Sequence, residues 1–286
     1  MSFQIITDSN ADLSAEVRKG FSDFHYLNVP FFIDDVEGDP NISGHEFFEK
    51  MRAGAKVRTA QINPPTYIAL YEELIEAGHT QFLCIAFSSK LSGLYESAVH
   101  AGQYVMDKHP EVNIITVDTI SASIGMGHLA KTAVELRDQG RSIEETRDWL
   151  ETNKQRVSHW FTVDDLIYLK RGGRITASAA WFGTALKIKP VLHVDNAGKL
   201  IAMEKKIGRK KALARIAEIV KETGTKPAEN TIWISHGDCL EEVEEIKEMI
   251  TAETGATKFV VTILGPVIGS HSGPGTLAVF FFASAR

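Results

Sequence analysis

Short apolar runs alternate with amphipathic stretches through the first half of the chain. The apolar runs predict strands, and the stretches between them are long enough to form helices that connect parallel strands. The predicted strands span residues 3–6, 25–33, 81–87 and 112–117, and the predicted helices span 44–53, 65–77, 92–108, 121–139 and 142–155. Strands that alternate with helices in this way predict βαβ units in a parallel sheet.

The pattern changes after residue 158, where strands become more frequent. The predicted strands span residues 160–163, 190–194, 199–205, 231–235, 258–263 and 276–283, and the predicted helices span 164–170, 177–186, 209–222 and 240–254. Within 191–201 an Asn-Ala-Gly turn separates two apolar runs, which predicts a β-hairpin. The fold class is therefore α/β, with an N-terminal parallel-sheet α/β domain at 1–156 and a C-terminal α+β domain at 157–286.

Length and composition agree with two globular domains. The chain has 286 residues, of which 44% are hydrophobic and 24% charged, and this is ordinary for a folded protein that buries two cores. The formal net charge of −6 argues against broad electrostatic binding to nucleic acid or to an anionic membrane. We therefore expect no nucleic-acid partner.

Cysteine usage and the two ends of the chain indicate a cytoplasmic protein. Cys84 and Cys239 lie in or beside apolar runs far apart in sequence, as free thiols do in a reducing compartment, and they show no metal-ligand spacing. The first six residues contain no basic leader, and the apolar run 277–283 falls well short of the ~18 residues that span a bilayer. We expect neither a metal site nor stable membrane insertion.

A glycine-rich segment at 264–276 surrounds a single histidine, His271. Glycines give such a loop conformational freedom to fold tightly around a guest, and its prolines limit the entropy of the loop. Histidine is the side chain there that changes charge most easily near neutral pH. An ordinary turn before a strand is the alternative interpretation.

Two polar segments stand at the ends of predicted strands. Residues 87–98 follow one strand and open a helix, with Ser92 and Gly93 at the junction. Ligands bind at such junctions, where helix N–H groups face anions, although Ser92 taken alone is better explained as a helix N-cap. Asp8 and Ser9 follow the first strand, where Asx and Ser turns are common.

Two further segments are compatible with ligand or partner contacts. Thr59 and Gln61 precede a helix and carry side chains that can donate hydrogen bonds, although many loops share this composition. Lys170, Arg171 and Arg174 flank a Gly-Gly pair, which suits contact with phosphate or an acidic partner. The bland alternative is a solvated helix end, where cations interact favourably with the dipole.

Together these segments resemble the DegV family of fatty-acid-binding proteins, also called FakB. The resemblance is carried by Thr-Asp-Ser-x-x-Asp-Leu at 7–13, Ser-Ser-x-Leu-Ser-Gly at 88–93, Tyr-Leu-Lys-Arg-Gly-Gly-Arg-Ile at 168–175 and Gly-x-His-x-Gly-Pro-Gly at 269–275. Order and spacing match along nearly the whole chain. The resemblance implies a bacterial carrier that buries a long-chain fatty acid in a tunnel at and near the domain interface.

The resemblance also assigns roles to individual residues. It implies that Thr59, Ser92 and Gly93 hold the carboxylate, while His271 and Arg209 line the same site and support phosphoryl transfer. A separate ATP-dependent fatty acid kinase then converts the bound acid to an acyl-phosphate for phospholipid synthesis. The carrier itself is not an enzyme, and its only bound group is the fatty acid, without a cofactor.

Further assignments concern the tunnel and the partner. The basic cluster Lys170, Arg171 and Arg174 is our candidate for docking the kinase, since charges at the rim of an interface steer association. The residues that we expect to line the acyl tunnel are Phe87, Ile124, Met126, Phe280 and Phe282.

Three positions depart from the family pattern. Leu94 stands where threonine is usual, and Ala60 and Ile62 replace serine and proline on either side of Gln61. These changes alter the polarity behind the carboxylate and the loop that carries Thr59, so the preferred chain length and head group stay open.

The main alternative is a serine-dependent acyl hydrolase. Ser92 would be the nucleophile, His271 the base, and Asp8 or Asp118 the residue that orients the base. However, the chain lacks Gly-x-Ser-x-Gly around Ser92, and no phosphate-binding glycine motif follows a predicted strand. The absence of a phosphate-binding glycine motif also argues against a nucleotide-binding enzyme.

Overall fold

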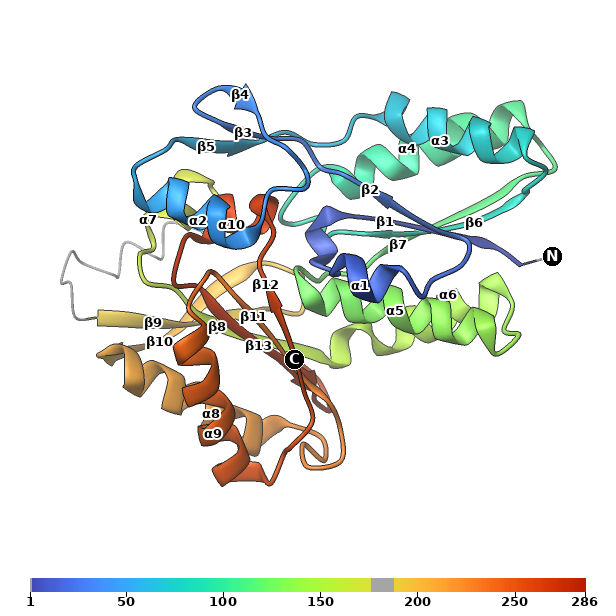
Figure 1. The fold of residues 1–286 in the computed structure, drawn as a ribbon. Coiled ribbons are helices and arrows are strands. Elements are labelled where there is room, and N and C mark those ends of the chain that lie inside the picture. The colour runs from blue at the N-terminus through green and yellow to red at the C-terminus, as the bar shows by residue number, and fades with distance from the viewer. Residues whose placement is uncertain (1, 176–187) are drawn as a thin grey trace. The chain divides into compact units, whose positions relative to one another are not determined.

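The computed structural model describes residues 2–175 and 188–286 (Figure 1). The chain divides into two compact units. Unit 1 comprises Met1–Pro30 and Thr59–Lys154, and unit 2 comprises Phe31–Arg58 and Gln155–Arg286. The sequence placed one boundary near residue 156, whereas the chain also leaves unit 1 for the segment Phe31–Arg58.

Unit 1 is a four-stranded parallel sheet with helices on both faces. Its elements are β1 (Gln4–Asp8), η1 (Ser9–Ala11), α1 (Ala15–Arg18), β2 (Phe24–Leu27), α3 (Pro64–Glu76), β6 (Gln81–Ala86), α4 (Leu94–Lys108), β7 (Asn113–Asp118), α5 (Ile124–Asp138) and α6 (Ile143–Asn153). The strand order is β2-β1-β6-β7, and all neighbours are parallel. Helices α3 and α4 cover one face, and α5 and α6 cover the other (Figure 1).

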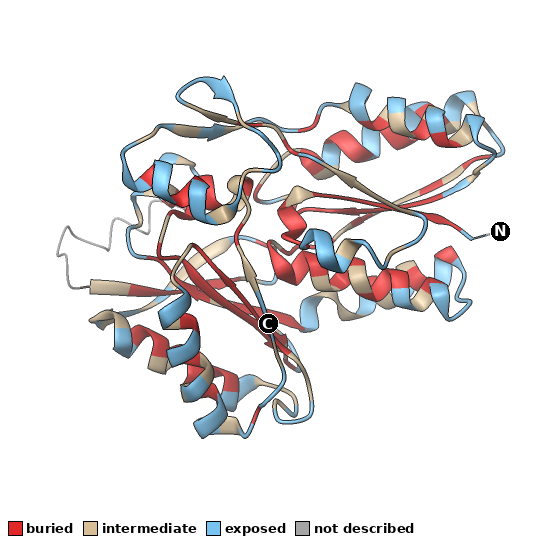
Figure 2. Cartoon of the chain, viewed as in Figure 1, coloured by how far each residue is buried: buried red, intermediate tan, exposed pale blue. Residues whose placement is uncertain are grey.

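The burial pattern explains why the sheet strands lack alternation in their sequence. Every residue of β1 is buried, and β6 is buried after its first residue (Figure 2). Strands covered on both faces read as continuous apolar runs, as parallel strands in α/β proteins do. The predicted parallel sheet is confirmed.

Unit 2 is built on a six-stranded mixed sheet. Its elements are β3 (Phe31–Ile33), β4 (Val36–Glu37), α2 (Gly44–Arg52), β5 (Val57–Thr59), β8 (Val157–Thr162), α7 (Ile167–Arg171), β9 (Ile188–Val194), β10 (Leu200–Ile207), α8 (Arg209–Thr223), β11 (Ile232–His236), α9 (Leu240–Thr254), β12 (Phe259–Ile263), α10 (Pro266–Ser272) and β13 (Leu277–Phe282); η2 (Lys154–Arg156) precedes β8. The large sheet has the order β10-β9-β8-β13-β11-β12, and β4-β3-β5 form a small second sheet. This is the predicted α+β architecture.

One core of unit 2 lies between the large sheet and helices α8 and α9. Leu277, Val279 and Phe281 of the central strand β13 point into it, together with Ile216 of α8 and Ile246 of α9. The hairpin predicted over 191–201 is present, because β9 and β10 pair antiparallel across the turn that follows β9.

The segment Phe31–Arg58 belongs to unit 2 because its aromatic residues pack there. Phe47 and Phe48 of α2 are fully buried in a cluster with Leu264. A side-chain carbon on Gly269 of α10 would lie 2.8 Å from the Phe48 ring, so the helix backbone packs directly on α2. No signal in the local sequence pattern links positions this far apart.

Most predicted elements are present with ends displaced by three residues or fewer. The single strand predicted over 25–33 is wrong: β2 ends at Leu27, and β3 begins at Phe31 in another sheet. Pro30 lacks the N–H group that a continuous ladder needs, and its carbonyl instead accepts a hydrogen bond from Ala60. The helix predicted over 177–186 lies outside the described residues.

The glycine-rich segment around His271 is more ordered than the loop that the sequence suggested. Residues Pro266–Ser272 form α10, with proline in its first turn. Gly273 then ends the helix with a φ of 84°. Proline is favoured at the start of a helix and glycine just after its end, and this asymmetry is the signal that identifies α10.

Candidate functional site

Three loops of unit 1 meet at the carboxyl ends of β1, β6 and β7. The connection from β1 leads to β2 on one side, whereas β6 leads through α4 to β7 on the other. The chain therefore leaves β1 and β6 toward opposite edges of the sheet. Ligands of open α/β sheets bind at the point where neighbouring strands are followed by connections in opposite directions. The sequence motifs 7–13 and 88–93 both lie at this edge.

Hydrogen bonds bring the segment of Thr59 to the same edge. The Val29 N–H donates to Ser9 Oγ over 3.0 Å, and the Ala60 N–H donates to the Pro30 carbonyl over 2.9 Å. A side-chain carbon on Gly93 would lie 2.6 Å from Gln61 Oε1, so Gln61 packs against this glycine. The structure thus brings together three polar segments that the sequence identified separately.

Ser92 does not act as the N-cap of α4. The N-cap is Gly93, and no side chain caps this helix in the described part of the protein. The Ser92 N–H donates to the Ser88 carbonyl over 3.2 Å, which leaves Ser92 in the turn before the helix. Thr59 and Ser92 are both partly buried. The capping alternative for Ser92 is therefore excluded by the observed helix start.

Helices α3 and α4 both begin at this edge and run in the same direction relative to the sheet. Each connects the carboxyl edge to the start of the next strand, and the two helices pack side by side (Figure 1). Asn63, the N-cap of α3, also makes no side-chain capping bond. Adjacent N-termini concentrate the positive ends of two helix dipoles, an arrangement that favours an anion. We call Thr59, Ser92, Gly93 and these two N-termini the helix-terminus site.

A buried carboxyl group lies at the end of β1. Asp8 Oδ1 accepts hydrogen bonds from the Asn10 N–H over 2.9 Å and from Asn10 Nδ2 over 2.6 Å. Burial raises the pKa of Asp8 to about 6, although the bonds from Asn10 oppose this shift. Asp118 ends β7 and accepts from the backbone N–H groups of Ser89 and Ile120. Asp8 is bonded within its own turn and Asp118 also accepts from the loop after β6, and in the described residues neither carboxylate accepts a bond from a histidine.

His271 lies on α10 of unit 2 and packs against the turn after α7. A side-chain carbon on Gly172 would overlap its ring, so glycine leaves the space that the imidazole occupies. Burial, and to a lesser degree the charge of Arg174, lowers the pKa of His271 to about 4. The imidazole is therefore neutral at pH 7.

The basic cluster predicted at the end of α7 is divided by burial. Lys170 and Arg171 are exposed at the helix terminus, whereas Arg174 is partly buried and donates to the Gly172 carbonyl. Burial also lowers the pKa of Arg174. Arg174 therefore lies near His271, whereas Lys170 and Arg171 face solvent.

Arg209 is held by several partners within unit 2. Its Nη2 donates to Glu242 over 2.7 Å and to the Gly275 carbonyl, and its Nε donates to the same carboxylate over 3.1 Å. The Arg209 side chain is only 14% exposed. Arg209 therefore fixes the turn that follows α10. The sequence did not predict this structural role.

The five apolar residues assigned to the tunnel belong to both units. Phe87, Ile124 and Met126 are buried in unit 1, and Phe280 is buried on β13 of unit 2. Phe282 is partly buried, with its ring 5.8 Å from that of Trp233. The structure shows that these side chains avoid water, while their contact with an acyl chain stays a prediction.

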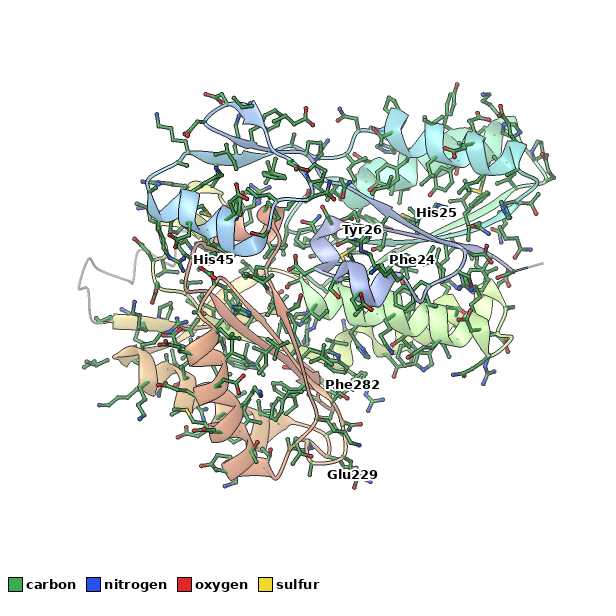
Figure 3. All side chains as sticks on the ribbon, in the orientation of Figure 1. Phe24, His25, Tyr26, His45, Glu229 and Phe282 are labelled. Atoms are coloured by element: carbon green, nitrogen blue, oxygen red, sulfur yellow. The ribbon has the colours of Figure 1, made fainter. Side chains whose placement is uncertain are left out.

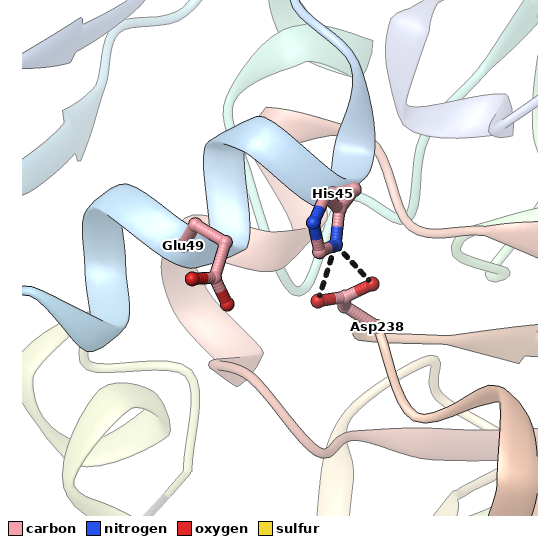
Figure 4. A group of neighbouring side chains, drawn as sticks. All are labelled: His45, Glu49 and Asp238. Atoms are coloured by element: carbon pink, nitrogen blue, oxygen red, sulfur yellow. Dashed lines mark hydrogen bonds and ion pairs between the residues drawn. The ribbon is translucent and has the colours of Figure 1, made fainter.

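One group of possible metal ligands escaped the sequence analysis. His45 and Glu49 of α2 lie near Asp238, which follows β11, and their ligand atoms are within 4.8 Å of one another (Figure 4). His45 Nδ1 is 3.0 Å from Asp238 Oδ1. However, Arg52 donates to both Glu49 and Asp238 and supplies a cation between these carboxylates. The group connects α2 to the loop after β11. Sequence patterns did not reveal it because His45 and Asp238 are 193 positions apart.

Both cysteines are free thiols, as predicted. Across residues 2–175 and 188–286, the helices are all too short or too polar to cross a bilayer.

Comparisons with family models, with related sequences and with solved structures all identify the same family. The model of the family described as "Uncharacterised protein, DegV family" matches residues 2–284. A DegV domain-containing protein of Clostridium perfringens is 40% identical, covering 99% of this chain and 98% of its own length. DegV, a fatty acid binding protein from Bacillus subtilis, is 30% identical to this chain in sequence. Its crystal structure matches with a TM-score of 0.85, over 99% of this chain and 100% of the DegV chain. A fatty acid binding DegV family protein from Streptococcus agalactiae is 26% identical with a TM-score of 0.86, covering 99% of each chain.

Proposed function

The chain belongs to the DegV family, and on this premise we propose that it binds a long-chain fatty acid and holds the carboxylate at the helix-terminus site. Thr59 and Ser92 donate hydroxyl groups, and Gly93 lets the ligand approach the first amides of α4. The fatty acid is the ligand, and the protein performs no chemistry of its own. The fatty acids bound by its structural relatives support this assignment.

The observation that carries the proposal is the convergence of two uncapped helix N-termini with two hydroxyl-bearing segments. A carboxylate taken from water must recover its lost hydrogen bonds, because an unpaired buried charge is costly. Hydroxyl groups and helix amides supply donors without a fixed cation. A site of this kind therefore suits an anion attached to an apolar chain.

The apolar part of the ligand supplies the driving force. Each methylene removed from water contributes roughly 0.8 kcal/mol, so about 15 methylenes give on the order of 12 kcal/mol before ordering costs. Buried residues such as Phe87, Ile124 and Met126 offer the apolar surroundings that this transfer requires. Phe280 and Phe282 are proposed in the same role.

We further propose that a separate ATP-dependent fatty acid kinase phosphorylates the bound acid, for use in phospholipid synthesis in the bacterial cytoplasm. His271 would then interact with the developing phosphate charge as a neutral imidazole, and Arg209 would hold the Gly275 turn beside it. Lys170 and Arg171 are exposed and suit docking of the kinase, whereas the partly buried Arg174 is better placed to act with His271.

The hydroxyl groups give the sharpest test of carboxylate binding. Thr59→Ala and Ser92→Ala each remove one donor to a charged acceptor, a loss of about 1.5–3 kcal/mol. We expect fatty-acid affinity to fall roughly 10- to 100-fold in either variant, measured by equilibrium binding to delipidated protein. Ser89→Ala removes a hydroxyl from the same loop and is the matched control. Equal affinity in all four proteins would exclude the helix-terminus site.

The kinase step needs a separate assay. His271→Ala should leave lipid binding nearly unchanged and slow kinase-dependent formation of the acyl-phosphate. Loss of lipid binding with normal turnover would contradict this division of roles. Ester hydrolysis that disappears in Ser92→Ala would instead support the hydrolase alternative, which no contact of Asp8 or Asp118 within the described part of the chain favours.

A further inference from the structure

Asp8 lies on the face of the unit 1 sheet that carries helices α3 and α4. Residues two apart on a strand share a face, so Asp8 points to the same side as Ile6. Ile6 is paired with Cys84 of β6, and Phe82, two residues before Cys84, packs its ring 5.3 Å from that of Tyr71 on α3. The carboxyl group therefore stands beneath the helices whose N-termini form the helix-terminus site, at the same edge of the sheet.

The hydrogen bonds from Asn10 are concentrated on one oxygen of this buried carboxyl group. Asp8 is 2% exposed, and both hydrogen bonds from Asn10 go to Oδ1. Among the described residues none donates to Oδ2. Burial disfavours the ionised form of this carboxyl group, whereas a protonated oxygen at this position becomes a hydrogen-bond donor itself.

The groups that face Asp8 do not neutralise its charge. Tyr67 of α3 and Cys84 of β6 interact with Asp8 from its own side of the sheet, whereas Tyr26 of β2 (Figure 3) pairs with Thr7 and points to the other face. Burial raises the pKa of each of the three, that of Cys84 to about 12, so all are uncharged at neutral pH. Asp12 and Arg18, which lie near Tyr26, carry opposite charges.

The cations of helix α5 pair elsewhere, Lys131 with Glu135 and Arg137 with the Ser22 and Asp23 carbonyls. Helix α5 packs on η1 through Gly127, whose missing side chain accommodates the Ala11 carbonyl. The first turn of α4 contributes Glu96, which is exposed and acidic. The charged form of Asp8 is therefore disfavoured even before a ligand binds, and burial raises its pKa to about 6.

We propose that Asp8 is a positioning residue whose carboxyl group takes up a proton when the fatty acid binds. This inference rests on the proposed function. A ligand carboxylate at the helix-terminus site adds a second negative charge at the same sheet edge, and two such groups in a dry site do not both stay ionised. The protonated Asp8 donates from Oδ2, and the ligand remains the anion that the helix termini stabilise.

The coupling between ligand binding and protonation of Asp8 determines how the affinity changes with pH. The free protein loses the Asp8 proton as the pH rises through about 6, and the bound ligand raises this pKa further. Binding therefore weakens as the pH rises above 6, by up to tenfold per pH unit for one linked proton. The affinity becomes constant again once the pH exceeds the pKa of the complex.

The test is isothermal titration of delipidated protein with dodecanoate at pH 7, in buffers of different ionisation enthalpy. The ligand carboxylate is itself ionised there, since ordinary carboxyl pKa values lie near 4. We expect uptake of a substantial fraction of one proton per ligand and a dissociation constant that rises about tenfold between pH 6 and pH 8. Asp8→Asn should bind without proton uptake and with a flat pH profile, because its amide oxygen still accepts from Asn10.

Two controls separate the possible failures. Asp12→Asn changes a neighbouring buried carboxyl and should retain the proton uptake, whereas dodecanol, which has no charge, should bind without uptake. Normal dodecanoate binding with no proton uptake by the unaltered protein would overturn the role of Asp8, whether or not Asp8→Asn folds. If neither dodecanoate nor palmitate binds at any pH, the proposed function is overturned instead.

Discussion

Replacing Asp8 with asparagine should stabilise the ligand-free protein at neutral and alkaline pH. The carboxyl group is fully buried, and burial raises its pKa from 3.8 to about 6. The folded state therefore binds this proton more tightly than the unfolded chain does. Stability is greatest while the group is protonated in both states, below about pH 4, and declines as the pH rises through 6.

The magnitude follows from the size of the shift. A difference of about 2 pKa units corresponds to roughly 3 kcal/mol, which the folded protein loses between pH 4 and pH 7. Asparagine removes this loss but forms a weaker bond with Asn10 than a carboxylate does, at a cost of about 1 kcal/mol. We expect Asp8→Asn to gain about 1–2 kcal/mol at pH 8 and nothing at pH 4.

Urea unfolding of delipidated protein, followed by far-ultraviolet circular dichroism from pH 4 to pH 8, measures this gain. The midpoints of the two proteins should diverge as the pH rises, with similar slopes against urea. Asp12→Asn is the control for removal of a buried carboxyl nearby. A constant difference between Asp8→Asn and the unaltered protein at every pH would refute the reasoning, because only titration of Asp8 produces the divergence.

Three further predictions concern the two units separately. Gly93→Val should weaken fatty-acid binding at least tenfold in a direct binding assay, because its side chain would meet Gln61 Oε1 at 2.6 Å and block the helix terminus; unchanged affinity would mean that the ligand does not approach Gly93. Gly269→Ala should lower the free energy of unfolding, measured in urea, by about 1–3 kcal/mol, because the added methyl group overpacks the aromatic cluster. Equal stability of the two proteins would show that Phe47 and Phe48 can move to make room for the methyl group. Reversing the charges of Lys170 and Arg171 should weaken kinase capture in a pull-down without emptying the lipid site, and undiminished capture would place docking elsewhere.

The sequence predicted the architecture of unit 1 well because local patterns determine it. Strands buried on both faces appear as apolar runs, and the helices between them end at glycines such as Gly78 and Gly140, which have positive φ. The same patterns placed Ser92 and Gly93 at a strand-to-helix junction. They did not show that Gln61 packs on Gly93, since that contact depends on how the chain returns after Arg58.

Contacts over long sequence separations account for what the sequence did not predict. The assignment of Phe31–Arg58 to unit 2 depends on Phe47 and Phe48 meeting α10, more than 200 residues later. Arg209 was assigned only by family resemblance, and its bonds to Glu242 and Gly275 emerge from the packed structure. Periodicity reports which face of an element is buried, but it does not identify the partner across that face.

The central claim, that this chain carries a fatty acid, is tested most directly by native mass spectrometry of protein purified without detergent. Solvent extraction of the same sample identifies whatever is bound. We expect a mass increase equal to one long-chain fatty acid per chain, and recovery of that acid as a negative ion near one equivalent. Protein that carries no lipid, and that shows no added mass after incubation with oleate or palmitate, would contradict the account.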